Sequence, residues 1–306
     1  MIRMSLLVAC ALTLGAAVTF AEDTPNFTHT TVDVPGADST GVMGVNNRGD
    51  LVGFYVAAGV QYGFVLRDGV VRTFDPPEPG ATVTEVDDIS ATGVLVWNYN
   101  PPGDSECLGP STNPWGMTYW PITRAFMLHK ASMTEIAFPD ACYTWANHIN
   151  ARGEVAGEYM VAGKGFGFVW NRGTFRTIDL SESPDELSWS SVRGMNANGD
   201  LAGWYGSGVT WTFHAYVMRN GQVTTIDGPG STWTIADGIN ARGDVIGWYF
   251  DAAFSGHGFV FADGHLSTLD IPGATDTYPY DISDNGTIVG YYRTEDTRLH
   301  GFILRR

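Results

Sequence analysis

The sequence predicts an all-β, six-bladed β-propeller with four antiparallel strands in each blade, and three observations lead to this prediction. A block of the form Ile-Asn-x-x-Gly, followed by an apolar stretch that ends in Tyr, recurs with its glycine at positions 49, 93, 153, 199, 243 and 286. Each repeat of about 45 residues holds short β-branched and aromatic runs separated by glycine turns. The last repeat ends at Arg306 without a fourth strand, and Thr30–Gly36 resembles the missing strand. A closed ring explains this split, because the N-terminal strand then completes the last blade and removes an exposed edge.

Composition limits the classes of function. The 306 residues carry a formal net charge of −16, with 33 acidic and 17 basic side chains. An acidic surface repels phosphate backbones, so we expect no nucleic-acid partner. The hydrophobic content of 44% is enough for one large core. We therefore predict a single propeller domain over residues 22–306, and we expect a monomer.

The N-terminus has the pattern of an export signal. One positive charge at Arg3 precedes an apolar run from Leu6 to Phe20, and Thr19-Phe20-Ala21 is a small-residue cleavage site. The run is too short to favour a stable membrane span, so we expect none in the mature chain. The segment Leu7–Cys10 also resembles a bacterial lipobox, which leaves a lipoprotein as the alternative. We predict a signal peptide over residues 1–21 and a secreted or periplasmic location in a bacterium.

Two cysteines would remain after cleavage, Cys107 and Cys142. In an oxidising compartment a lone pair usually forms one disulfide, so we predict this bond. The alternative is two buried thiols.

A second block follows each glycine turn, and it carries the resemblance to a known family. It occurs as His214-Ala215-Tyr216, His257-Gly258-Phe259 and His300-Gly301-Phe302. Together with the Ile-Asn-x-x-Gly block it resembles the extracellular HAF-repeat family over essentially the whole mature chain. In the first three repeats Tyr62, Arg124 and Phe166 stand at the histidine position. The resemblance implies export and a repeat architecture, and it implies no settled activity.

Columns of the repeat separate packing positions from candidate ligand positions. In the first strand of each repeat one face is small or apolar throughout: Val42, Val86, Ala146, Val192, Ala236 and Pro279. The opposite face differs between repeats and reads Met43, Asp87, Asn147, Arg193, Asp237 and Tyr280, preceded by Gly41, Glu85, Trp145, Ser191, Ile235 and Tyr278. Side chains of a strand alternate between its faces, and a uniform column indicates blade packing. If this strand is innermost, the varied face lines a central funnel.

The second repeat contains an insertion, Pro101–Thr123, between its second and third strands. It carries Trp115, Tyr119 and Trp120. Held by the predicted disulfide, this loop would arch over the funnel and offer aromatic rings to a ligand. The alternative is a surface loop whose tryptophans cover the core of its own blade.

The first functional hypothesis is an exported protein that binds a polar small molecule or a carbohydrate, including a polysaccharide, in the funnel. Carboxylates and amides would bond to hydroxyl groups, and aromatic rings would stack. The predicted ligand-binding residues are Glu85, Asp87, Trp115, Trp120, Trp145, Asn147, Arg193, Asp237, Tyr278 and Tyr280.

Two other classes of function stay open. Asp87, Asn147 and Asp237 offer oxygen ligands for Ca²⁺ in a lactonase-like hydrolase, by analogy of fold only. Glu85 and Tyr280 are candidate catalytic residues, with Glu85 as a general base, and a metal-free hydrolase or lyase is also open. The third possibility is a structural or surface-interaction protein.

Other motifs predict structure rather than chemistry. Arg48-Gly49-Asp50 and Arg242-Gly243-Asp244 fall in the repeat turn, so turn chemistry explains them better than cell adhesion. His214, His257 and His300 share one column, for which we expect a repeated hydrogen-bonding role rather than zinc. His148 lies on the packing side, so we expect a structural role for it as well.

Overall fold

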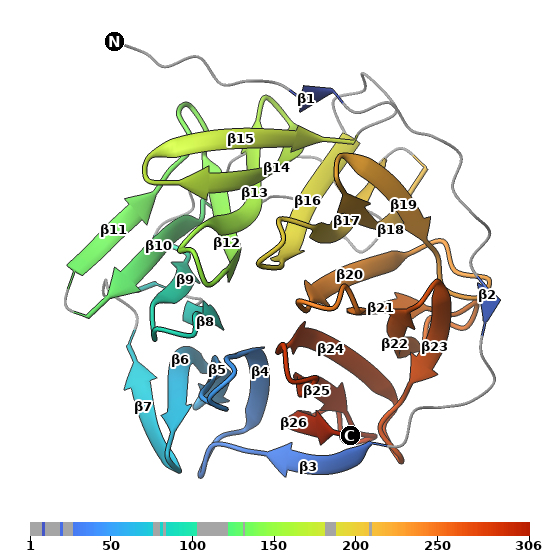
Figure 1. The fold of residues 1–306 in the computed structure, drawn as a ribbon. Helices are drawn as coiled ribbons and strands as arrows, with labels where there is room; N and C mark the ends of the chain where they lie inside the picture. Colours follow the sequence, from blue (N-terminus) through green and yellow to red (C-terminus); the bar gives the residue numbers. More distant parts are fainter. Residues whose placement is uncertain are drawn as a thin grey trace.

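The computed structural model describes residues 8–9, 19–20, 27–75, 80–81, 84–102, 122–130, 132–180, 188–207 and 210–306. Within these ranges the chain is built from strands and turns, without a helix long and apolar enough to cross a bilayer. The sheets stand around a common centre in a propeller-like arrangement (Figure 1). The prediction of an all-β, propeller-like fold is therefore confirmed.

Each sheet is built on a meander of four antiparallel strands. Two meanders are complete sheets. The first has β4 (Ser39–Val45), β5 (Leu51–Ala57), β6 (Val60–Arg67) and β7 (Val70–Phe74), and the second has β8 (Thr84–Ile89), β9 (Leu95–Tyr99), β10 (Arg124–His129) and β11 (Ser132–Ile136). A third meander makes up four strands of a five-stranded sheet: β20 (Thr234–Ile239), β21 (Val245–Phe250), β22 (Gly256–Ala262) and β23 (His265–Leu269). The predicted insertion does lie between β9 and β10.

A nine-stranded sheet contains two more meanders: β12 (Tyr143–Ile149), β13 (Val155–Val161), β14 (Lys164–Asn171) and β15 (Thr174–Asp179); β16 (Ser188–Met195), β17 (Leu201–Ser207), β18 (Thr212–Arg219) and β19 (Gln222–Ile226). One register pair, Gly165 of β14 opposite Trp189 of β16, joins them. The short strands β1 (Val8–Ala9) and β2 (Thr19–Phe20) pair in parallel with β15 and β23.

The last meander is completed by the N-terminal side of the chain. β24 (Asp276–Ile282), β25 (Ile288–Arg293) and β26 (Leu299–Arg305) are followed in the sheet by β3 (Thr28–Val32). β3 is antiparallel to β26, with Val32 opposite Gly301, and His300 Nδ1 lies 3.0 Å from Asp33 Oδ2. The predicted closure is thus confirmed, although the strand begins two residues earlier than expected and ends at Val32.

Closure makes the first strand of every meander an inner strand. We call β4, β8, β12, β16, β20 and β24 the inner strands, and β5, β9, β13, β17, β21 and β25 the second strands. Each inner strand contacts the next one around the centre, and β24 contacts β4, so the ring of contacts is complete (Figure 1).

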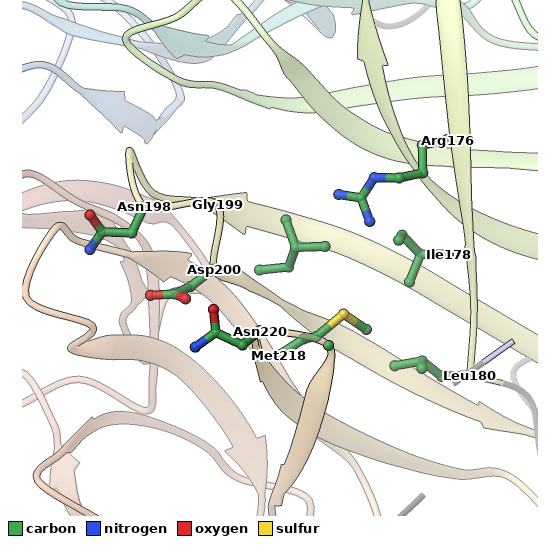
Figure 2. A pocket seen from close by; sticks show the side chains of 10 residues that line it. Arg176, Ile178, Leu180, Asn198, Gly199, Asp200, Met218 and Asn220 are labelled. Atoms are coloured by element: carbon green, nitrogen blue, oxygen red, sulfur yellow. The ribbon is translucent and has the colours of Figure 1, made fainter. Parts of the chain in front are cut away.

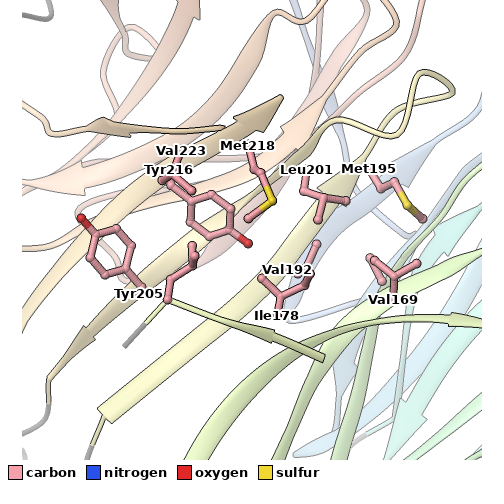
Figure 3. Packing of buried hydrophobic residues seen from close by; sticks show 11 residues of the cluster. Val169, Ile178, Val192, Met195, Leu201, Tyr205, Tyr216, Met218 and Val223 are labelled. Atoms are coloured by element: carbon pink, nitrogen blue, oxygen red, sulfur yellow. The ribbon is translucent and has the colours of Figure 1, made fainter. Parts of the chain in front are cut away.

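Neighbouring meanders pack through the apolar column that the sequence predicts. Val192 of β16 is fully buried in a cluster with Val169, Ile178, Leu201 and Tyr216 (Figure 3). Val42, Val86, Ala146 and Ala236 are also fully buried. Because this column fills each interface in the same way, it leaves the opposite face of the inner strands free to vary.

The recurring turn explains the Arg-Gly-Asp motif. Gly49 takes a φ of 84°, a conformation that favours glycine, and its N–H donates to the carbonyl of Asn46 at 2.9 Å. The Asn46 side chain accepts hydrogen bonds from the backbone N–H groups of Arg48 and Asp50. These residues therefore form the hairpin turn between β4 and β5.

The histidine column has the repeated hydrogen-bonding role that we expect. His214 Nδ1 lies 2.8 Å from Asp227, and His257 Nδ1 lies 2.9 Å from Asp270. Each pair joins the third strand of a meander to the residue after the fourth, as His300 and Asp33 do.

A buried ion pair links three inner strands. His148 of β12 lies 2.8 Å from Asp88 Oδ2 through Nδ1 and 2.8 Å from the carbonyl oxygen of Met195 through Nε2. Both partners are acceptors, so both ring nitrogens donate and the imidazole holds its second proton. Burial lowers the pKa of His148, but the Asp88 carboxylate outweighs it and raises that pKa to about 9. His148 therefore has the structural role that the sequence predicts, because it bonds to the inner strands on both sides of its own.

Glycines in the second strands allow the inner strands to come close. A Cβ on Gly247 of β21 would collide with the carbonyl oxygen of Ile235, and Gly53, Gly157, Gly203 and Gly290 have the same relation to their inner strands. In β9 this position holds Trp97, which packs against Phe126.

We predict that Gly247→Ala lowers the free energy of unfolding by about 1–3 kcal/mol, because the added methyl group forces β20 and β21 apart. Urea unfolding followed by tryptophan fluorescence measures the difference. A variant as stable as the wild type would contradict the close approach of these two strands.

The His148–Asp88 pair predicts a pH dependence. The pKa of His148 is higher in the folded chain than the unfolded value of about 6.5, so its contribution is complete below that pH and is lost as pH rises through about 9. We expect the unfolding free energy to fall by roughly 2–3 kcal/mol between pH 6.5 and pH 9.5. His148→Gln should lack this part of the decline, and equal declines in both proteins would refute the pair's role.

Candidate functional site

The varied residues of the inner strands coincide with β-bulges. In β4 the register with β5 passes from Val42 to Gly44, so that Met43 has no partner. The other inner strands skip Asp87, Asn147, Arg193, Asp237 and Tyr280 in the same way. A bulge re-aims a side chain and is frequent next to functional sites. Each bulge therefore falls on a position of the predicted funnel column.

Asp87 connects two neighbouring meanders. Its Oδ1 accepts a hydrogen bond from Trp145 Nε1 of β12 at 3.0 Å, and its Oδ2 accepts one from Asn98 Nδ2 of β9 at 2.6 Å. Asn98 also bonds to both backbone polar groups of Ala146. These bonds join Asp87, Asn98 and Trp145, and Glu85 shares a side-chain hydrogen bond with Asp87.

Glu85 and Asp87 form a pair of neighbouring carboxyl groups, of which Asp87 is buried and Glu85 is half-buried. Burial raises the pKa of Glu85 to about 7, against the opposing effects of the Arg193 charge and of the hydrogen bond from Gln61. Burial and the negative charge of Glu85 together raise the pKa of Asp87 well above its usual range. A carboxyl group with a pKa of about 7, such as Glu85, suits proton transfer near neutral pH.

Arg193 lies between polar groups of both adjacent meanders. Its Nη1 donates to Asn147 Oδ1 at 3.3 Å, and its Nε is 4.0 Å from Asp237 Oδ1. Burial opposes the charge of Arg193, but the carboxylates of Glu158 and Asp237 outweigh it and raise its pKa. About a quarter of the Arg193 side chain, 26%, is exposed, so the group stays accessible.

Several buried polar atoms in this cluster have no hydrogen-bond partner among the described residues. Around Arg193 they are its own Nε, Oε2 of Glu158, Oγ of Ser191 and Oδ2 of Asp237, and others, such as Thr84 Oγ1 and Trp97 Nε1, lie elsewhere in the fold. Glu158 is only 5% exposed, and its other oxygen accepts from the Tyr143 hydroxyl at 2.9 Å. An unpaired buried polar group costs roughly 1–3 kcal/mol, so such a concentration calls for a functional explanation.

The second strands supply residues that the sequence analysis missed. Each lies opposite the inner-strand position that precedes the bulge by two residues, the column of Glu85 and Trp145. They are Asn98, Glu158, Trp248 and Tyr291. This column also differs between repeats, reading Phe54, Asn98, Glu158, Trp204, Trp248 and Tyr291. The signal that marks the inner strands was therefore present here as well. We name the axial cluster as Glu85, Asp87, Asn98, Trp145, Asn147, Glu158, Arg193, Asp237 and Tyr280.

The two predicted tyrosines of the last repeat differ in their contacts. Tyr280 bonds to Tyr291 through their hydroxyl groups at 3.2 Å, whereas the Tyr278 ring packs against Trp248 at 5.3 Å. Trp115, Trp120 and Cys107 lie outside the described residues, so the aromatic arch and the disulfide to Cys142 stay predictions.

The predicted calcium ligands have other partners. Both oxygens of Asp87 accept hydrogen bonds, and Arg193 lies between Asn147 and Asp237. Over the described part of the chain, no three His, Cys, Asp or Glu side chains are placed to hold a metal ion. The arrangement adds no support for calcium, which stays a prediction.

Two cavities lie elsewhere in the fold. One of about 160 Å³ is bounded by Arg176, Ile178 and Leu180 on one side and by Asp200 and Met218 on the other (Figure 2). A hollow of about 80 Å³ is lined by Asp88, His148, Asp281 and the turns after the inner strands. Neither includes a residue of the axial cluster.

Comparison with known proteins bears on the fold. No protein-family model and no curated protein matches the chain. A triple arginine-to-alanine mutant of AofleA from Arthrobotrys oligospora has a TM-score of 0.51 and 12% identity, over 95% of this chain and 90% of that one. A putative TolB from Agrobacterium tumefaciens has a TM-score of 0.51 and 16% identity, over 74% and 75%.

Two other similarities are weaker. The fucose-specific lectin from Aleuria aurantia has a TM-score of 0.47 and 12% identity, over 75% of this chain and 76% of the lectin. Porphyromonas gingivalis dipeptidyl peptidase 4 has a TM-score of 0.44 and 11% identity, and the match spans only 44% of its length. At such low identities, the chain is similar to these proteins in fold alone.

Proposed function

We propose that the chain is a six-bladed propeller that binds a polar small molecule or a carbohydrate at the axial cluster. The blade count follows if the nine-stranded sheet is divided at its one linking register pair into two four-stranded blades. The observation that carries the functional proposal is the set of buried, unpartnered polar atoms beside the partly exposed Arg193.

Hydroxyl groups of a ligand fit this set of atoms. Arg193 reaches solvent with 26% of its side chain and its guanidinium donates hydrogen bonds, while the carboxyl groups of Glu158 and Asp237 beside it accept them when ionised. A sugar hydroxyl is both donor and acceptor, so neighbouring hydroxyls can satisfy such a mixed group. The Trp145 ring next to Asp87 adds an apolar face to the same region.

We also propose where the protein is located. The HAF-type repeats and the N-terminal pattern support an exported protein with a cleaved segment 1–21. Export would allow the bond between Cys107 and Cys142, which would hold the insertion near the axial cluster. A monomer is sufficient for the site, because all of its residues come from one ring.

We expect ligands of this class to raise the melting temperature of the wild-type chain in a screen of neutral sugars, amino sugars, uronates and lactones. Glu158→Gln and Asp237→Asn should weaken binding at least about tenfold, because each removes a charged hydrogen-bond acceptor while keeping its shape. Differential scanning fluorimetry followed by calorimetry measures both effects.

Asp263→Asn is the matched control, since Asp263 is an exposed turn residue remote from the inner strands. It should bind as the wild type does. If no compound shifts the wild-type melting temperature, or if the control loses binding equally, the axial cluster is not a ligand site and a structural role is favoured.

A second candidate function is an enzyme that uses the same cluster. The Glu85–Asp87 pair favours it, because burial holds the pKa of Glu85 at about 7 and a general acid or base works best near that value. Tyr280 is the other candidate catalytic residue, although burial and the neighbouring Tyr291 raise its pKa well above the usual range.

We predict that Glu85→Gln reduces turnover of any lactone or glycoside hydrolysed by the wild type by about 10²–10⁴-fold, a larger factor than its effect on ligand affinity. Product formation followed by mass spectrometry measures the loss. A wild-type chain that binds compounds from the panel without converting them would leave binding as its function.

A further inference from the structure

A small cavity opens between the third and fourth repeats, beside the turn that follows β16 (Figure 2). Its volume of about 160 Å³ is below the roughly 300–1,000 Å³ of cavities that hold drug-sized ligands, so it fits only a small molecule. Arg176, Asn198 and Asn220 on its rim are exposed, so the cavity is open to solvent. Its floor is apolar and almost fully buried, and it consists of Ile178, Leu180, Leu201 and Met218.

The cavity has a physical origin in the residue that ends the third strand of the third repeat. In the fourth repeat this position holds Arg219, whose Nη2 donates to the carbonyl of Gly243 in the turn of the next repeat at 2.7 Å. The third repeat has Asn171 there, which donates instead to Glu154 of its own meander at 3.4 Å. The shorter side chain therefore leaves the turn at Gly199 open on this side.

Arg176 is the cationic group of this cavity. Its side chain extends from β15 toward the turn at Gly199 (Figure 2). Among the described residues its guanidinium has no ion pair and no hydrogen bond. The carboxylate of Glu154 in the same meander is already paired with Arg152 at 2.7 Å and also accepts from Asn171. The donors of Arg176 are therefore available to a ligand.

The groups around the cavity identify the kind of ligand. The planar guanidinium of an arginine matches a carboxylate through two parallel hydrogen bonds, which favours that anion. The apolar floor requires that the rest of the ligand be apolar, because a buried polar group without a partner is costly. Asp200 also lines the cavity and repels a second negative charge, as does the net charge of −16. A small apolar molecule with a single carboxylate meets all three conditions.

We propose that this cavity is a second binding site, which takes a small organic monocarboxylate with its carboxylate on Arg176 and its apolar part against Met218. Met218 is the most accessible residue of the floor, at 8% exposure, and its flexible side chain can adapt to the ligand. The site shares no residue with the axial cluster, so it goes beyond the function proposed above and does not depend on it.

The test is a calorimetric titration with isovalerate and phenylacetate, and with their amides, glutarate and inorganic phosphate for comparison. We expect at least one monocarboxylate to bind the wild type with a Kd of about 1 mM or tighter, and its amide, glutarate and phosphate to bind at least about tenfold more weakly. Arg176→Gln should weaken binding of the monocarboxylate at least about tenfold. The matched control is Arg72→Gln, since Arg72 is exposed at the same fourth-strand position of the first repeat, and this variant should bind as the wild type does.

A second variant tests the floor of the cavity. Met218→Trp introduces the residue that the third repeat has at this position, Trp170, and its larger ring should fill the cavity and abolish binding. Arg176 is exposed, so Arg176→Gln keeps the fold and decides the proposal even if Met218→Trp does not fold.

Four results would overturn the second site. They are no binding of either monocarboxylate, equal binding of the acids and their amides, equal losses in Arg176→Gln and Arg72→Gln, and unchanged binding by folded Met218→Trp. Loss of binding in Asp237→Asn would assign the monocarboxylate to the axial cluster and would overturn the second site as well, while supporting the function proposed above.

Discussion

The pairing of β3 with β26 is the constraint on which the rest of the structure depends. It turns an open series of meanders into a ring, so that each inner strand has a neighbour on both sides and β24 meets β4. In such a ring the apolar column must be nearly uniform, and Val42, Val86, Ala146, Val192 and Ala236 all lie fully buried. The opposite column of the inner strands does not pack between blades, so its residues can differ from repeat to repeat. Polar residues can therefore gather near the centre without weakening the contact between blades.

The cost of the polar centre is offset by the structure around it. One residue beyond the bulges, Asp88 and His148 form a buried ion pair that also bonds to Met195 and so ties three inner strands together. Glycines such as Gly247 let the second strands lie against the inner strands where these bulge. Arg193, Glu158 and Ser191, in contrast, keep polar atoms without partners among the described residues. The inner strands are thus held together by contacts outside the axial cluster, whereas polar atoms around Arg193 have no hydrogen-bond partner among the described residues.

Much of this was predictable from the repeat, and the exceptions have physical reasons. Uniform and varied columns identified the inner strands and most of the cluster, because equivalent blades impose equivalent packing, and the missing fourth strand of the last repeat identified the closing strand. The second-strand residues Glu158 and Trp248 were missed, although their column varies in the same way, since only the first strand was assigned to the centre. The bulges were also missed, although the apolar positions of each inner strand, such as Val42 and Val45, lie three residues apart in every repeat, a spacing that strict alternation between the two faces does not give.

Hydrogen exchange at the closing strand tests the account most directly. Residues 28–32 are the edge strand of their blade, and half of their backbone N–H groups should be protected by bonds to β26. We predict that a peptide covering this segment exchanges as slowly as one covering β23, another fourth strand, and that both deprotect together in rising denaturant. Rapid exchange of residues 28–32 in a chain whose other fourth strands stay protected would show an open ring, and the axial cluster would then have no basis.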